Sequence, residues 1–185
     1  MSTANLEHIK LVDDSGAISQ DVTFPAGVMI NTTVYDIGKG AMGAQAAFPA
    51  DNTNPQRSEG TEFFSQAYTP STANCTLLIR THCYLAETTN IADDMGFALF
   101  ISDDDDALQA NSSIWGTYGS SYGHDVGCRV IEHSMASWGE TEKTFSLRAH
   151  KCNAFNYPHV YGTNHSANYY GSAATSKFII QEVAT

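Results

Sequence analysis

Two sets of side chains, one more apolar than the other, alternate along residues 75–87. Successive side chains of a β-strand point to opposite faces, so a period of two separates two sets of residues. One set is Leu77, Ile79, Thr81, Cys83 and Leu85, and the other is Leu78, Arg80, His82 and Tyr84. The first set is more apolar, so we expect it to face a core. The pattern predicts a long, half-buried strand.

Further segments carry strand-forming residues between turn signals. They are residues 28–35, 61–68, 96–102, 128–133, 143–150 and 177–183. No segment keeps a helical period, and charged residues make up only 16% of the chain, with Ser, Thr, Asn and Gly abundant. About eight short strands with frequent turns predict an all-β fold, an antiparallel, jelly-roll-like β-sandwich with long loops.

The apolar residues that share parity within these strands are the expected core. They are Leu77, Ile79, Leu85, Phe97, Leu99, Ile101, Phe145, Leu147, Phe178 and Ile180. We expect one sandwich domain over residues 22–185, with long loops over 36–60 and 153–176. Residues 1–21 are polar and acidic, so we predict an N-terminal arm that docks on a neighbouring subunit or protein. The alternative is a strand added to a sheet edge of the same domain.

The charge balance restricts the partners. Twenty Asp and Glu residues against nine Lys and Arg residues leave a net charge of −11. Nucleic-acid binding needs a basic patch, so we expect no nucleic-acid partner. The apolar runs are far shorter than the ~20 residues of a membrane helix, so we expect no membrane insertion. The N-terminus lacks the pattern of a secretory signal, and we expect folding in the cytoplasm.

The four cysteines, Cys75, Cys83, Cys128 and Cys152, form no C-x-x-C motif. Zinc-ribbon and thioredoxin-type sites are therefore unsupported. We expect buried, reduced thiols; a bond between Cys83 and Cys152 across strands is the alternative.

Residues 119–123 match the G-x-S-x-G motif of serine hydrolases, with Ser121 as the nucleophile, and His124-Asp125 follow directly. The hydrolase mechanism needs the serine on a sharp strand-to-helix turn. Here the following residues lead into a predicted strand, so we interpret the segment as a loop. We expect no enzyme and no cofactor.

Asp103, Asp104, Asp105 and Asp106 form an acidic run where a hairpin tip is expected. Calcium needs oxygen ligands that converge from a shaped loop, and the run lacks the spacing of an EF-hand. We expect a solvated turn and no metal site; weak divalent binding is the alternative. His82 and His150 are expected on outward strand faces.

Aromatic side chains concentrate in predicted loops. The candidate binding residues are Trp115, Tyr118 and Tyr122 in one loop and Tyr157, Tyr161, Tyr169 and Tyr170 in another. Aromatics among Asn, Ser and Gly are typical of recognition surfaces and sugar platforms. The alternative is that these loops pack on the core.

Four stretches of sequence occur in a characteristic order. They read PAGVMI at 25–30, YTPSTANCTLLIR at 68–80, KTFSLRA at 143–149 and SKFIIQEV at 176–183. This layout resembles β-sandwich modules of tail-fibre and related virion proteins of tailed bacteriophages. The resemblance implies a virion structural protein without catalysis, a homotrimer, and contacts with other virion proteins.

Within that class we expect a surface-exposed tail-fibre or spike module for host attachment, with a host surface glycan as a further partner. The expected location is the virion. The few residues before the first strand keep a capsid-decorating (cement) protein as an alternative. A carbohydrate-binding lectin is the alternative of another class.

Overall fold

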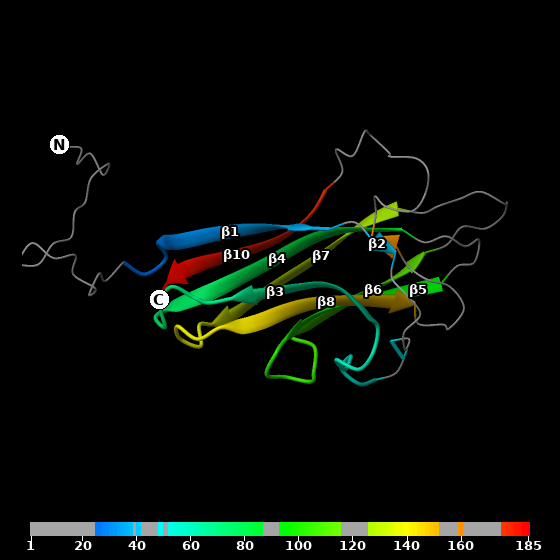
Figure 1. The fold of residues 1–185 in the computed structure, drawn as a ribbon, viewed down its shortest axis with the longest axis horizontal. Helices are drawn as coiled ribbons and strands as arrows, with labels where there is room; N and C mark the ends of the chain where they lie inside the picture. Colours follow the sequence, from blue (N-terminus) through cyan, green and yellow to red (C-terminus); the bar gives the residue numbers. More distant parts are fainter. Residues whose placement is uncertain are drawn as a thin grey trace, which may run out of the picture.

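The computed structural model describes residues 25–38, 40–41, 48–49, 52–86, 93–115, 126–151, 159–160 and 175–185. These residues form two antiparallel β-sheets packed as a sandwich (Figure 1). No helix occurs in these ranges, and so none that could span a membrane. The predicted all-β sandwich is confirmed. The predicted arm, residues 1–21, lies outside the described residues.

The first sheet contains β1 (Met29–Ile37), β10 (Ser176–Ala184), β4 (Cys75–Ala86) and β7 (Val126–Ala136), in that order. Two short strands, β9 (His159–Val160) and β2 (Gly40–Ala41), extend it beside the end of β4. The second sheet contains β3 (Thr61–Tyr68), β8 (Lys143–Lys151), β5 (Asp93–Ile101) and β6 (Gln109–Trp115).

The eight long strands follow one topological rule. Counted along the chain, the first strand pairs with the eighth, the second with the seventh, the third with the sixth and the fourth with the fifth. One sheet therefore has the order 1-8-3-6 and the other 2-7-4-5. This is the jelly-roll order, in which an antiparallel ribbon folds over on itself as two Greek keys.

The core between the sheets is apolar and aromatic. Every predicted core residue is buried, so that prediction is confirmed. The Phe178 ring is central: its centroid lies 5.1 Å from that of Phe64, 5.7 Å from Phe145 and 6.3 Å from Tyr35. An irregularity in register between Glu62 and Phe64 lets both Phe63 and Phe64 pack against the core.

A second, smaller apolar cluster covers the outer side of β5. Phe48 packs there on Ala98 and Phe100, and all three are buried. His150, expected on an outward face, does lie on the outer side of β8, but it is buried too. The second sheet is thus covered on both sides at this point, because Phe48 lies over its outer side, against Gly60 and Gly96.

Two further expectations need correction. Residues 109–115 form strand β6, although no strand was predicted there. Trp115 is the last residue of that strand and does not lie in a loop as expected. The segment is polar, QANSSIW, and forms a strand because it pairs with β5 as the second arm of a hairpin.

Candidate interaction surface

No segment of the described chain covers the outer face of the first sheet. Three rows of side chains cross it from β1 through β10 and β4 to β7. The rows are Thr32–Gln181–Leu78–Ser134, Val34–Ile179–Arg80–Glu132 and Asp36–Lys177–His82–Val130. None of these residues is buried. We call this surface the open face.

The apolar exposure of the described residues concentrates on this side of the sandwich. Val34 is 53% exposed, and Leu78 and Val130 are each 39% exposed. The other exposed large hydrophobic residues of the described chain are Met29, the first residue of β1 in the same sheet, and Val28 just before it. Scattered exposed hydrophobic residues are ordinary, but their concentration on one sheet indicates an interaction surface.

The charges on the open face cancel. Arg80 Nε lies 2.6 Å from a Glu132 carboxylate oxygen, and Lys177 pairs with Asp36. Each pair joins two neighbouring strands, and each lies in a row of its own. The open face is thus locally neutral in a chain of net charge −11.

A shallow hollow of about 250 Å³ lies over β4, β7 and β10. Its polar lining includes Arg80, Glu132, Ser134 and Gln181, and Leu78 contributes apolar surface. Planar guanidinium, carboxylate and amide groups beside an apolar side chain can hydrogen-bond a polar ligand while packing on its apolar side.

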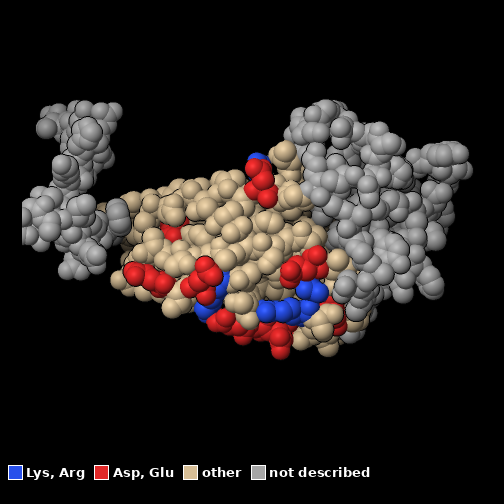
Figure 2. Space-filling model, in the orientation of Figure 1, with Lys and Arg blue, Asp and Glu red and all other residues tan. Residues whose placement is uncertain are grey.

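Charged groups gather elsewhere. In Figure 2 they concentrate along the lower margin, where Figure 1 places β8 and the turn after β5, while the area over β1 carries few. This margin contains the acidic run of the β5–β6 turn.

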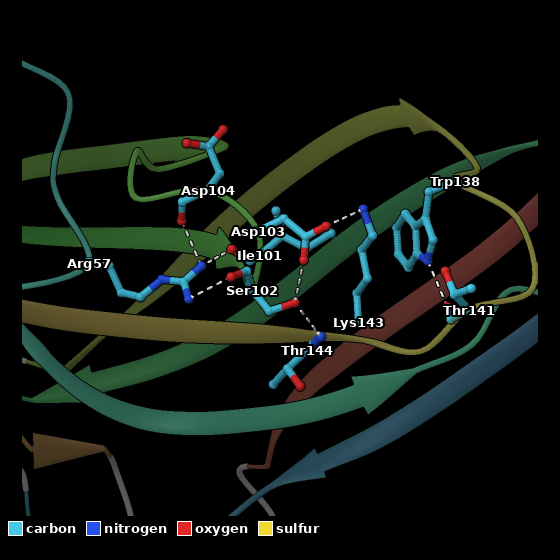
Figure 3. A network of polar contacts seen from close by, with 9 residues as sticks. All are labelled: Arg57, Ile101, Ser102, Asp103, Asp104, Trp138, Thr141, Lys143 and Thr144. Carbon is cyan, nitrogen blue, oxygen red and sulfur yellow. Dashed lines mark hydrogen bonds and ion pairs between the residues drawn. The ribbon is translucent and has the colours of Figure 1, made fainter.

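Arg57 organises the acidic turn (Figure 3). Its guanidinium donates hydrogen bonds to the backbone carbonyls of Ile101, Ser102 and Asp104. The backbone N–H of Arg57 also donates to the carbonyl of Asp105, at 2.8 Å. The turn is therefore held by a side chain that stands 44 to 47 residues earlier in the sequence.

Lys143 ties the same turn to β8. Its ammonium lies 2.7 Å from Asp103 Oδ2 and 5.2 Å from the centre of the Trp138 ring (Figure 3). The hydrogen bond from Lys143, together with one from Ser102, lowers the pKa of Asp103. Asp103 is therefore an ion-pair partner at neutral pH.

The acidic run closes its own turn and does not form an ion cage. The Asp106 side chain accepts from Gln56, and Asp104 Oδ1 accepts from the backbone N–H of Asp106 at 3.0 Å. Across the described residues, no three His, Cys, Asp or Glu side chains gather in a way that suits a metal ion. The geometry therefore agrees with a turn role for the run.

A buried carboxylate, which sequence reasoning missed, joins β10 to the β3–β4 connection. Glu182 is 0% exposed and accepts hydrogen bonds from the Tyr68 hydroxyl and from both the backbone N–H and the hydroxyl of Ser71. Burial alone raises the pKa of Glu182, but the hydrogen bonds from Ser71 and Tyr68 outweigh it, so the net pKa is lowered. Burial above all, and then the hydrogen bond to Glu182, raise the pKa of Tyr68.

The sequence-predicted aromatic site cannot be assembled from the described residues. Trp115 ends β6. The other candidates, Tyr118, Tyr122, Tyr157, Tyr161, Tyr169 and Tyr170, lie outside the described residues, as do Ser121 and the rest of the G-x-S-x-G segment. The structure instead reveals the open face. Its signal in the sequence was the second set of the alternation in 75–87, which contains Leu78 among polar residues.

None of the protein-family models and none of the curated proteins matches this chain. Among solved structures, dimeric latent PorU from Porphyromonas gingivalis is similar over 92% of this chain and 15% of that chain, with 7% identity and a TM-score of 0.44. The structure of the infectious bursal disease virus Gx strain is similar over 85% of this chain and 38% of that chain, with 12% identity and a TM-score of 0.34. The chain spans well under two thirds of either protein. Likenesses this distant carry no function from those proteins to this one.

Proposed function

We propose that this chain is a non-enzymatic structural protein of a virus particle that works through surface contacts. The observation that carries the proposal is the jelly roll with one sheet covered by its own chain and the other sheet presenting the open face. Jelly rolls recur in capsid and lectin domains, which supports the proposal as an analogy of fold. The resemblance of its sequence to phage virion modules supports it independently.

Within that class the favoured role is a tail-fibre or spike module for host attachment in a tailed bacteriophage, assembled as a homotrimer. Capsid decoration is the rival in the same class. Both roles use a rigid β-scaffold that presents loops and a sheet face to a partner. They differ in where the protein lies in the particle.

Quantitative mass spectrometry of separated heads and tails, from particles released by cells that carry the gene, tests the proposal. We expect peptides of this chain in one fraction at a fixed ratio to the major capsid or tail protein. Recovery with tails supports attachment, and recovery with heads supports decoration. Absence from both fractions, with the protein free in the cell lysate, would sink the proposal.

The hollow on the open face favours one candidate of another class, a carbohydrate-binding lectin. Arg80, Glu132 and Gln181 present donors and acceptors that suit sugar hydroxyls, beside the apolar Leu78. Glycan-array binding by the purified protein, lost in Gln181→Ala and kept in Ser65→Ala on the other sheet, would support this role. No binding to any glycan would count against it.

A further inference from the structure

We propose that the open face is a contact surface for a second copy of this chain, and that the two copies meet face to face across a two-fold axis. This goes beyond the proposed function and does not depend on it. A protein that stays outside virus particles can still pair through this face, so the two proposals fail separately.

The size of the open face suits a protein partner. β1 and β10 each have nine residues. Four strands about 4.8 Å apart, with roughly 3.3 Å per residue, give a projected area of roughly 20 by 30 Å. Pleated side chains expose more surface than this projection, and a standard interface takes about 800 Å² of accessible surface from each partner. The open face is therefore of the order that a stable dimer needs.

The charge layout suits a copy of the same chain as the occupant. Two chains of net charge −11 repel each other over most of their surfaces. On the open face, however, Arg80 and Lys177 are matched by Glu132 and Asp36 within their own rows. Two copies that meet here bring neutral surfaces together, and their excess acidic charge stays away from the contact. A strongly basic partner would find no excess acidic charge to bind.

The apolar side chains supply the attraction. Val34, Leu78 and Val130 lie in three different rows and on three different strands, so together they cover the width of the face. Burying apolar area yields roughly 25 cal/mol per Å² before the costs of association. The covered outer side of the second sheet has no comparable exposed apolar set in the described chain.

A surface that meets its own copy makes an isologous, two-fold contact. This contact is distinct from the three-fold contact that the family resemblance implies, and one assembly can contain both. Self-association through the open face therefore predicts an even number of chains: two if it acts alone, and six if trimers also form.

Sedimentation equilibrium of the full chain over a range of concentrations tests the inference. We expect a dimeric or hexameric mass for the wild type. Leu78→Glu and Val34→Glu place the same new charge on both partners, so each should weaken the contact on the order of 100-fold and halve the mass. The control Ser65→Glu adds the same charge at an exposed position of β3, on the other sheet, and should leave the mass unchanged. Unchanged melting temperatures show that the variants are folded.

Two further measurements separate this contact from the alternatives. Mixing Leu78→Glu with Leu78→Lys should restore more of the even-numbered mass than either variant shows alone, since the mixed pair adds no net charge to the contact. Raising the salt concentration should strengthen pairing, because salt screens the repulsion between acidic chains and leaves apolar burial intact. A monomeric or trimeric wild type, or variants that keep the wild-type mass, would overturn the inference. A monomeric wild type whose glycan binding is lost in Leu78→Glu would assign the face to a sugar instead.

Discussion

Glu182 places a carboxylate among side chains that are otherwise mostly apolar. It stays ionised there because three donors, the Tyr68 hydroxyl and the N–H and hydroxyl of Ser71, converge on its two oxygens. The Cys75 thiol approaches the same carboxylate at 3.8 Å. A buried charge needs such partners to offset its lost hydration. The contact therefore fixes the β3–β4 connection against the last strand of the fold.

The lowered pKa of Glu182 predicts how stability varies with pH. The ordinary value is 4.5, and the folded value lies below it. The contribution of Glu182 to the free energy of unfolding is therefore complete above the unfolded pKa and is lost as the pH falls through the folded pKa. Glu182→Gln should remove that part of the acid sensitivity and cost about 1–3 kcal/mol at neutral pH, because a buried donor loses its partner. Urea titrations between pH 3 and pH 7, compared with the exposed control Glu140→Gln, measure both effects.

Cys83 provides a second prediction for a single residue. Burial above all raises the pKa of its thiol to about 12, and the side chain is fully enclosed. Thiolate is the reactive form, so Cys83 should resist alkylation in the folded protein and react only after unfolding. Iodoacetamide labelling at pH 8 followed by peptide mass spectrometry checks this. Rapid labelling of Cys83 without denaturant would contradict the packing around β4.

At the scale of elements, the β5–β6 turn depends on Arg57. The planar guanidinium reaches three carbonyls at once, and a lysine ammonium lacks that fork. Arg57→Lys should therefore destabilise the protein by about 1–3 kcal/mol and loosen the turn. Hydrogen exchange of the turn amides should be faster in Arg57→Lys and unchanged in Lys177→Arg, a control on the other sheet. Equal exchange rates in the two variants would show that the turn holds itself.

The Phe48 ring packs on the outer side of the second sheet. A Cβ added at Gly60 would lie 2.5 Å from the Phe48 ring and one at Gly96 would lie 2.8 Å from it, so both glycines make room for this ring. Phe48→Ala should cost about 3–5 kcal/mol, because it uncovers Ala98 and Phe100. Thermal melting measures the loss. A cost under about 0.5 kcal/mol would mean that the ring is not part of the folded core.

The alternation in the sequence predicted most strands, because strands with one buried face show a period of two. Residues 61–68 formed a strand with the expected bounds, and 143–150 extended by one residue. β6 was missed because QANSSIW lacks that period: Gln109, Ala110 and Asn111 are exposed. Phe48 was missed because it stands in an Ala- and Gly-rich stretch, and only the run FALFI at 97–101 hinted that both faces of β5 are covered.

For the molecule as a whole, the candidate site was harder to predict than the fold. The composition of the loops singles out their aromatic side chains, but composition does not say which side chains meet in space. The open face depends on register: Val34, Arg80 and Glu132 share a row only because β1, β10, β4 and β7 pair as they do. That pairing joins residues up to about 150 positions apart, as Met29 and Val183 show, and no local pattern in the sequence encodes it.

The pairing of the first long strand with the last has a mechanical consequence. The N–H of Gly27 donates to the carbonyl of Ala184, and the N–H of Ala184 donates to the carbonyl of Val28. The start of β1 and the end of β10 therefore lie at the same end of the sandwich, on the left in Figure 1. Hydrogen bonds between antiparallel strands run across the strands. A force that pulls residues 25 and 185 apart therefore acts on the hydrogen bonds between β1 and β10 one after another. The domain should therefore unfold at low force in this direction. A force applied between opposite ends of a pair of strands would instead act on many of their hydrogen bonds at the same time.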